Sequence, residues 1–222
     1  MQASASSAAA DAMPFQYITI EGPIGVGKSS LARRLAARLD AATVLEERAN
    51  PFLADFYADR PGAAFQTQLF YLLNRHRQQS GLRQSDLFAQ TMVSDYVFDK
   101  DKIFAYLNLD DNELFIYQRL FDLLSKDIPS PDLVVYLQAP TDELLRRLRE
   151  REREDDMPDP SPQYVREVNE AYQHFFFHYS ATPLLVVETS QIDLRASDDA
   201  LDDLVRQIQG MQRGTRYYVP RS

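Results

Sequence analysis

The chain has 222 residues, enough for one domain with a buried core, and carries 24 lysines and arginines against 33 aspartates and glutamates. The net charge of −9 makes binding to a nucleic-acid backbone a poor prediction, and no apolar run approaches the roughly twenty residues that span a membrane. The absence of cysteine excludes disulfides and thiolate metal sites.

The first residues differ in composition from the rest of the chain. Residues 1–12 are rich in alanine and serine, but they lack the basic start and the long apolar core of a secretion signal. We therefore predict a disordered leader at residues 1–14 and a single domain at residues 15–222. We also predict that the protein is cytoplasmic.

A glycine-rich segment at residues 21–30 organises the rest of the chain. Residues 15–20 before it are apolar and β-prone, and residues 31–39 after it repeat leucine at four-residue spacing, as in a helix. The segment matches G-x-x-x-x-G-K-[ST] in the strand–loop–helix context that this phosphate-binding motif, the P-loop, requires. Glycines let backbone N–H groups point inward, and the helix N-terminus adds positive charge. The predicted triphosphate-binding residues are Gly22, Pro23, Ile24, Gly25, Val26, Gly27, Lys28, Ser29 and Ser30.

Two side chains of the P-loop have specific expected roles. Lys28 is expected to reach the β- and γ-phosphates, and the Ser29 hydroxyl is expected to hold Mg²⁺. A glycine turn without any ligand is the alternative, and the Lys-Ser pair in the right flanking context argues against it. The chain is therefore predicted to bind a nucleoside triphosphate.

The remaining elements alternate between strands and helices. Further strands are predicted at residues 43–46, 91–94, 133–137 and 184–188. Helical stretches are predicted at residues 63–79, 101–107, 112–125 and 163–179, from residue 141, and at residues 200–211. The run at 133–137 is apolar throughout, which suits a strand buried on both faces of a parallel sheet. The pattern predicts an α/β P-loop kinase fold, with a five-stranded parallel sheet covered by helices on both faces.

The P-loop identifies a phosphoryl donor but does not identify the acceptor. A GTPase would need an Asn-Lys-x-Asp tetrapeptide, which this sequence lacks, and a motor ATPase would normally need a longer chain. A small-molecule kinase needs a base, an acceptor pocket and a lid of arginines over the transferring phosphoryl group. The sequence offers candidates for each of these parts.

The lid candidate is a segment at about residues 147–162. Arginines at 147, 149, 151 and 153 alternate with other residues ahead of a proline-rich loop. The planar guanidinium donates two hydrogen bonds at once, which suits phosphoryl oxygens. The alternative is a solvated helix end with Glu–Arg pairs, each worth a few tenths of a kcal/mol. With a P-loop present, an arginine-rich lid is the better prediction.

Three carboxylates follow predicted strands and are candidates for the base. They are Glu46, Glu47 and Asp95. Ligands of parallel α/β sheets sit outside the carboxyl ends of the strands, where these residues are expected. The sequence pattern does not choose among the three.

The ordered motifs from residue 15 to residue 189 resemble the bacterial deoxynucleoside kinases. This is the deoxyadenosine/deoxyguanosine kinase branch of the family that includes deoxycytidine kinase. The motifs are YITIEGPIGVGKS at 17–29, NPFL at 50–53, FQTQ at 65–68, VSDY at 93–96 and PDLVVYL at 131–137. The resemblance implies ATP-dependent 5′-phosphorylation of a 2′-deoxynucleoside, most consistent with a purine, in nucleotide salvage. It also implies a Mg²⁺ cofactor and a homodimer.

The resemblance also assigns roles to individual residues. Glu47 best matches the catalytic carboxylate, with Glu46 one residue away as the alternative, and its role would be to accept the 5′-hydroxyl proton. Gln66, Arg75 and Asp99 are expected around the nucleobase.

Further roles concern the sugar, the phosphates and the metal. Tyr57 and Asp156 are expected at the sugar 3′-hydroxyl, Asp95 at the acceptor and at Mg²⁺, and the lid arginines around the phosphates. The lid arginines implied are Arg147, Arg151 and Arg153, with Arg151 also catalytic beside Lys28.

The sequence departs from the family pattern after the third strand. Family members commonly carry Glu/Asp-Arg-Ser there, whereas this chain has Asp95 followed by Tyr96. Arg48, Lys100 and Lys102 are the candidates to replace the missing positive charge. The aromatic run at residues 175–177 is expected to cover the sheet in part and to meet a second subunit in part.

The sequence argues against two other functions. A nucleoside monophosphate or thymidylate-type kinase would need extra basic groups for a phosphorylated acceptor, which the region of Gln66 does not obviously supply. A non-catalytic nucleotide-binding regulatory module is disfavoured because Lys28, Ser29, Glu47 and the arginine-rich lid occur together.

Overall fold

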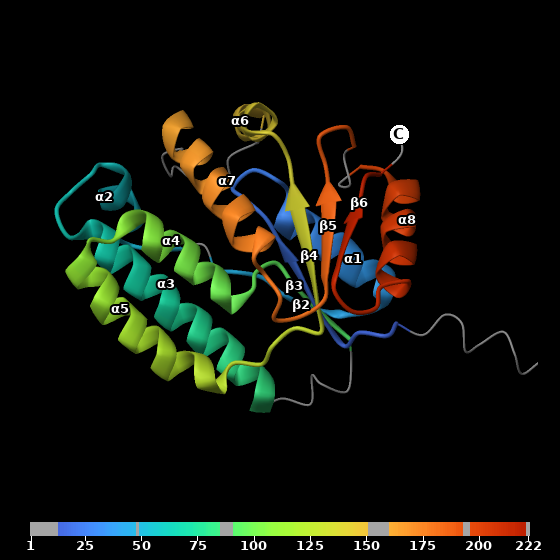
Figure 1. Cartoon of the computed structure of the whole chain (residues 1–222), viewed down its shortest axis with the longest axis horizontal. Helices are drawn as coiled ribbons and strands as arrows, with labels where there is room; N and C mark the ends of the chain where they lie inside the picture. The colour runs from blue at the N-terminus through green and yellow to red at the C-terminus, as the bar shows by residue number, and fades with distance from the viewer. Residues whose placement is uncertain (1–12, 48, 85–90, 151–159, 193–195, 221–222) are drawn as a thin grey trace, which may run out of the picture.

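The computed structural model describes residues 13–47, 49–84, 91–150, 160–192 and 196–220. Within these residues, the centre is a parallel six-stranded sheet in the order β2-β3-β1-β4-β5-β6, with helices on both faces (Figure 1). The strands are β1 (Tyr17–Glu21), β2 (Ala42–Val44), β3 (Met92–Ser94), β4 (Leu133–Gln138), β5 (Leu184–Glu188) and β6 (Thr215–Tyr218). The predicted parallel α/β fold is confirmed.

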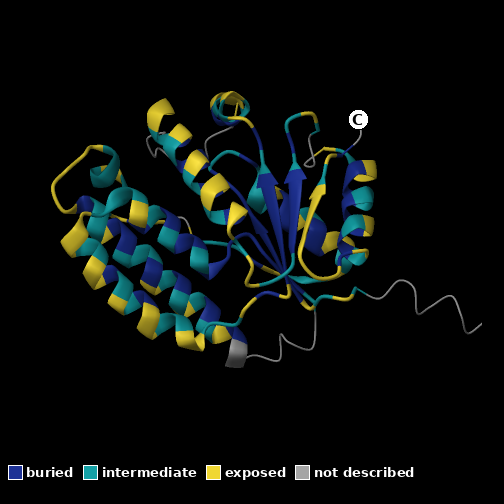
Figure 2. Ribbon diagram, viewed as in Figure 1, coloured by how far each residue is buried: buried dark blue, intermediate teal, exposed yellow. Residues whose placement is uncertain are grey.

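The sixth strand corrects the prediction of five. β6 pairs in parallel with β5, from Leu184 opposite Thr215 to Val187 opposite Tyr218. It is short and mostly exposed, as its yellow arrow in Figure 2 shows, and it lacks the apolar run that marks β4 and β5. A four-residue edge strand of this kind carries too little hydrophobic pattern to be recognised from sequence.

Helices connect the strands and cover both faces of the sheet. They are α1 (Lys28–Leu39), α2 (Leu53–Tyr57), α3 (Ala63–Ser80), α4 (Asp101–Asn108), α5 (Asp111–Leu124), α6 (Thr141–Glu150), α7 (Pro162–Phe177) and α8 (Asp198–Gln209). Short 3-10 turns lie at η1 (Gly81–Gln84), η3 (Phe98–Lys100) and η4 (Ser125–Asp127). Among the described helices, none combines the length and hydropathy needed to cross a bilayer.

The hydrophobic core occupies both faces of the sheet. On one face, α1 and α8 pack on alternate strand residues such as Ile20, Val135 and Leu185. On the other face, α4 and α7 cover the intervening residues, and Phe176 stacks on Tyr136 with ring centroids 4.3 Å apart. The aromatic run of α7 is therefore divided, as expected: Phe176 is buried against the sheet, whereas its neighbour Phe177 is exposed.

A helical layer of α3, α4 and α5 stands beside the sheet (Figure 1). Its own apolar cluster includes Leu72 of α3, Ala105 of α4, and Tyr117 and Phe121 of α5. This layer positions the site, because polar residues of α3 meet the chain just after β2 and β3.

Candidate active site

The P-loop joins the carboxyl end of β1 to the first turn of α1. Its backbone has left-handed conformations at Gly25, with φ of 85°, and at Gly27, with φ of 102°, which glycine adopts without a Cβ penalty. A Cβ on Gly25 would also lie 2.9 Å from Cγ of Leu148, so the loop packs directly against α6. The ammonium of Lys28 crosses the loop and donates to the carbonyl oxygens of Gly22 at 2.7 Å and Pro23 at 3.1 Å.

The environment of Lys28 lowers the pKa of its ammonium group. Burial is the largest cause, and the nearby charge of Lys100 acts in the same direction, so the pKa of Lys28 falls to about 8. The carboxylates of Glu21, Glu46 and Asp95 oppose this shift only in part. Lys28 is therefore mainly charged at neutral pH but titrates within the range in which kinases are assayed.

The Asp95 carboxylate links the P-loop to the chain after β2. Its Oδ2 accepts a hydrogen bond from the Ser29 hydroxyl, and its Oδ1 accepts one from the backbone N–H of Glu46 at 2.7 Å. Two oxygen ligands side by side at the edge of a phosphate-binding loop suit Mg²⁺, which binds one or two protein oxygens and completes its shell with phosphates and water. Within the described residues no three acidic or His side chains cluster as a metal site.

Glu46 lies at the centre of a buried charged cluster. Its Oε1 accepts from Nε of Arg75 at 2.8 Å and from Nη2 at 2.5 Å, and its Oε2 accepts from Nζ of Lys100 at 2.6 Å. Burial alone would raise the pKa of Glu46, but the charges and hydrogen bonds of Arg75 and Lys100 outweigh it and hold that pKa well below the usual range. Glu46 is therefore an ionised carboxylate at neutral pH.

The cluster continues from Arg75 into the helical layer. The guanidinium of Arg75 also forms an ion pair with Asp101, which is fully buried. Asp101 accepts from the Tyr117 hydroxyl at 2.7 Å, and its backbone carbonyl accepts from the amide of Gln68 at 3.0 Å. A continuous polar network thus runs from the P-loop to a buried Gln–Arg–Asp group between α3 and α4.

Several predicted residues lie outside this network. Glu47 is more than half exposed, and its carboxylate is 3.5 Å from Arg77, which is also exposed. Gln66 is exposed on α3, and Asp99 pairs with Lys102 at 2.9 Å near the surface. The geometry therefore favours Glu46, Gln68 and Asp101 over Glu47, Gln66 and Asp99.

Helix periodicity explains the choice of glutamine. Gln68 precedes Arg75 by seven residues, close to two full turns, so both side chains share one face of α3. Gln66 precedes Arg75 by nine residues, two and a half turns, and points to the opposite face. The seven-residue spacing between Gln68 and Arg75 can be read from the sequence, and it would have pointed to Gln68.

Comparisons with known proteins identify the family of this chain. A model of the deoxynucleoside kinase family matches residues 18–212. The chain belongs to this family. Deoxyadenosine/deoxycytidine kinase of Bacillus subtilis is 30% identical over 200 residues, covering 86% of this chain and 90% of that protein. Deoxyguanosine kinase of the same organism is 35% identical over 141 residues, covering 62% of this chain and 67% of that protein.

Solved structures show the same fold. Deoxyadenosine kinase from M. mycoides with bound dATP matches with a TM-score of 0.70 and 22% identity, covering 86% of this chain and 97% of that chain. The same kinase with the products dCMP and dCDP matches with a TM-score of 0.73 and 20% identity, covering 87% and 99%. This deoxynucleoside kinase family member is thus a phosphotransferase with the P-loop kinase fold.

The structure indicates which group takes the place of the missing family arginine. Lys100 is buried, binds Glu46 and lies 3.9 Å from Glu21, whereas Lys102 faces Asp99 at the surface. Arg48 lies outside the described residues. Of the two described candidates, Lys100 is therefore the one that lies beside Glu46, together with Arg75.

The lid is described only in part. Arg147 is largely buried and donates to the Val26 carbonyl at 3.3 Å and to the Thr189 hydroxyl at 3.1 Å, while Glu143 accepts from its Nε at 2.7 Å. It thereby connects α6 to the P-loop and to the end of β5. The predicted lid residues Arg151, Arg153 and Asp156 lie outside the described residues.

Tyr57 lies at the end of α2, beside α7. Its ring centroid lies 6.3 Å from that of Tyr164 on α7, so α2 and α7 meet there. The hydroxyl of Tyr164 accepts a hydrogen bond from Asn108 at 3.0 Å. Tyr57 therefore lies at a helix junction, and its predicted contact with the sugar stays a prediction.

Proposed function

We propose that the protein transfers the γ-phosphoryl group of ATP to the 5′-hydroxyl of a 2′-deoxynucleoside, preferentially a purine. The observation that carries the proposal is the polar network that joins Ser29, Asp95 and Glu46 to Arg75 and Asp101. The network connects a donor site to a buried group able to read a nucleobase, and this is the arrangement that a two-substrate kinase requires. Membership of the deoxynucleoside kinase family supports the same reaction.

Glu46 is the proposed general base. It stands between the P-loop side and the helical layer, and it is ionised because Arg75 and Lys100 stabilise its charge. A carboxylate held in this way can accept a hydrogen bond from the acceptor hydroxyl, orient it, and take its proton as the phosphoryl group moves. Lys100 then has a positioning role, since its hydrogen bond fixes one oxygen of Glu46.

The donor half is assigned to the P-loop and to Mg²⁺. Backbone N–H groups and Lys28 are proposed to hold the phosphates, and Ser29 with Asp95 to hold the metal ion. When bound, Mg²⁺ neutralises charge on the phosphates. Arg151 and Arg153 are proposed to contact the same phosphates, and Asp156 with Tyr57 the sugar 3′-hydroxyl, in keeping with the family resemblance.

The acceptor half is assigned to Gln68, Arg75 and Asp101. Together they offer an amide that both donates and accepts, a guanidinium that donates and a carboxylate that accepts. Such a set can pair with the edge of a base that carries a donor beside an acceptor. The purine preference rests on the names of relatives, which include a deoxyguanosine kinase and deoxyadenosine kinases.

The proposal includes a homodimer in the cytoplasm. The exposed side chains of Ile116 and Leu123 on α5 are the apolar surface that a second subunit would cover. ATP as the phosphoryl donor supports a cytoplasmic location.

The alternative of a monophosphate kinase is less well supported. A phosphorylated acceptor needs unpaired cations, whereas Arg75 and Lys100 are already paired with Glu46. The test is an assay with ATP and each deoxynucleoside or deoxynucleoside monophosphate, scored for new phosphorylated product. Turnover of purine deoxynucleosides is expected. Turnover with monophosphates alone would contradict the proposal, and no turnover with any acceptor would favour a regulatory module.

A further inference from the structure

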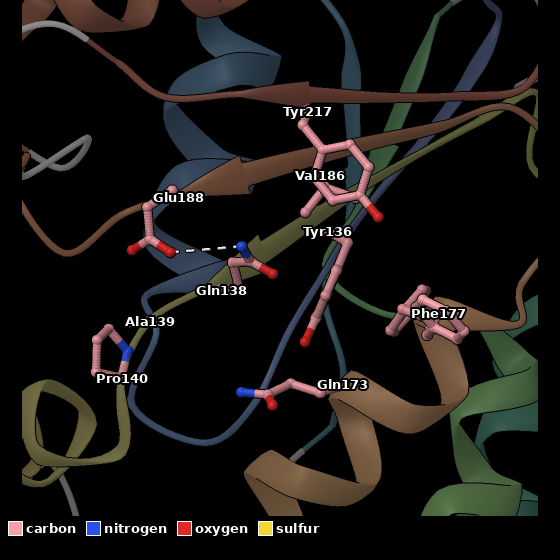
Figure 3. A pocket seen from close by; sticks show the side chains of 10 residues that line it. Tyr136, Gln138, Ala139, Pro140, Gln173, Phe177, Val186, Glu188 and Tyr217 are labelled. Atoms are coloured by element: carbon pink, nitrogen blue, oxygen red, sulfur yellow. Dashed lines mark hydrogen bonds between the residues drawn. The ribbon is translucent and has the colours of Figure 1, made fainter.

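A cavity separate from the candidate active site lies between the sheet and the end of α7 (Figure 3). Its volume is about 380 Å³, at the lower end of the range for small-molecule sites. No residue of the polar network at Glu46 lines it. Its lining includes the side chains of Tyr136, Gln138, Gln173, Phe177, Glu188 and Tyr217.

Part of the cavity wall lies outside the region that the family accounts for. The family match ends at residue 212, whereas Tyr217 belongs to β6 (Thr215–Tyr218), the strand added at the edge of the sheet. On this face α7 packs against β4 and β5, whereas β6 at the edge of the sheet is mostly exposed, as Figure 2 shows. Tyr217 is thus a part of the cavity wall that the family match does not include.

Tyr136 provides a second, independent sign of a ligand. The residue is 2% exposed, and its hydroxyl finds no hydrogen-bond partner among the described residues. An unpaired buried hydroxyl costs about 1–3 kcal/mol, so its retention calls for a partner that the chain itself does not supply. The hydroxyl points from β4 toward the space that the side chains of Gln138 and Gln173 also face (Figure 3).

The protonation state of Tyr136 determines whether its hydroxyl can donate a hydrogen bond. Burial raises the pKa of its hydroxyl, and the negative charges of Glu21 and Glu188 raise it further. The hydroxyl is therefore protonated and is available as a donor to an acceptor atom of the ligand.

The charged groups of the lining exclude anions. Glu188 is the one ionisable acid among the lining residues, and none of them is Lys, Arg or His. Its Oε1 accepts from the Ser190 N–H at 2.9 Å and its Oε2 from the Gln138 amide at 3.4 Å, so Oε2 keeps the capacity to accept a shorter bond. A phosphate would be repelled there, whereas an N–H donor would be attracted.

Aromatic rings flank the polar floor. Phe177 is 78% exposed and Tyr217 is 68% exposed, and both line the cavity. Exposed rings beside polar groups are the combination that stacks on a flat heteroaromatic molecule while its edge forms hydrogen bonds.

We propose that this cavity is a second binding site for an uncharged nucleobase or nucleoside. The ring stacks on Phe177 or Tyr217, an N–H edge faces Glu188, and an acceptor atom takes the hydrogen bond of Tyr136. The nucleoside form is bound and the 5′-phosphorylated form is rejected.

Calorimetric titration of the full chain with deoxyadenosine tests the site. Y136F removes only the hydroxyl, and it is expected to weaken this site about three- to tenfold. Y217A removes a stacking ring and is expected to weaken it about tenfold or more. F115A removes an exposed ring on α5, 57% exposed, and serves as a matched control with unchanged binding. Deoxyadenosine 5′-monophosphate is expected to leave the site empty.

The outcome does not depend on kinase activity. If the active site also binds the nucleoside, the wild-type protein shows two binding sites per chain and Y217A shows one. If the active site does not bind the nucleoside, the wild-type protein shows one binding site and Y217A shows none. Equal numbers and affinities in wild type, Y136F and Y217A would overturn the proposal, as would equally tight binding of the monophosphate. A change of oligomeric state in Y217A, seen by light scattering, would also overturn it, because the cavity would then be a subunit contact.

Discussion

Replacing Glu46 with glutamine is the sharpest test of the catalytic cluster. Glu46→Gln keeps the shape of the side chain and one acceptor oxygen, but it removes the negative charge that faces Arg75 and Lys100. Glu47→Gln is the matched control one residue away, because Glu47 is more than half exposed and its partner Arg77, 3.5 Å away, is more exposed still.

The structure gives the expected size of the effect on stability. Glu46 accepts three hydrogen bonds from cations, at 2.8, 2.5 and 2.6 Å. Removing one partner of a buried ion pair costs about 3–5 kcal/mol, but Arg75 retains its pair with Asp101 and glutamine retains one acceptor. We therefore expect a loss of about 2–4 kcal/mol, seen as a fall in Tm of about 5–15 °C. Glu47→Gln is expected to cost at most about 1 kcal/mol.

The kinetic effect separates catalysis from stability. At a temperature at which both variants are folded, Glu46→Gln is expected to lower kcat about 10²- to 10⁴-fold, the usual range for loss of a general base. Glu47→Gln should keep kcat within about twofold of wild type, as expected for an exposed pair that contributes little. The assay is initial-rate phosphorylation of deoxyadenosine or deoxyguanosine at saturating ATP. A larger loss of kcat in Glu47→Gln than in Glu46→Gln would refute the reasoning.

Three further predictions follow from other parts of the site. The ammonium of Lys28 is charged only below its pKa of about 8, so the affinity for ATP should fall as pH rises through 8. In Lys28→Arg the affinity for ATP should stay level between pH 7 and 9, because arginine keeps its charge there. Equal pH profiles for the two proteins would contradict this prediction. Gln68→Ala should raise the KM for the deoxynucleoside about tenfold, while Gln66→Ala leaves that KM unchanged. The reverse result would show that Gln66, not Gln68, contacts the nucleobase. EDTA should abolish turnover until Mg²⁺ is added back, and Asp95→Asn should raise the Mg²⁺ concentration needed for half-maximal rate.

The framework of the fold was predictable because each of its signals is local. The P-loop carries its own glycines at the positions where left-handed backbone is needed, and β4 and β5 are apolar runs of the length of a strand. β6 carries no such signal: it is four residues long and exposed, and it is recognisable only once it pairs with β5.

Site residues were harder to predict because their positions depend on contacts between distant elements. Glu46 and Glu47 are neighbours with the same side chain, and only the packing of α3 (Ala63–Ser80) and η3 (Phe98–Lys100) on the end of β2 buries the first and leaves the second exposed. The role of Lys100 has the same origin, since nothing in its local sequence distinguishes it from Lys102.

The charge distribution separates the cations of the Glu46 cluster from the exterior of the protein. With 33 acidic residues against 24 basic ones, the surface as a whole repels phosphate. The two cations that bind Glu46 lie beneath this surface: Arg75 is 5% exposed and Lys100 is 2% exposed. Buried cations are screened little by salt and are held in position by Glu46, so they act on the reacting groups without attracting nucleic acid to the exterior. Replacing Lys100 by Met should consequently change kcat, because it frees one oxygen of Glu46, while leaving nonspecific binding to polyanions unchanged.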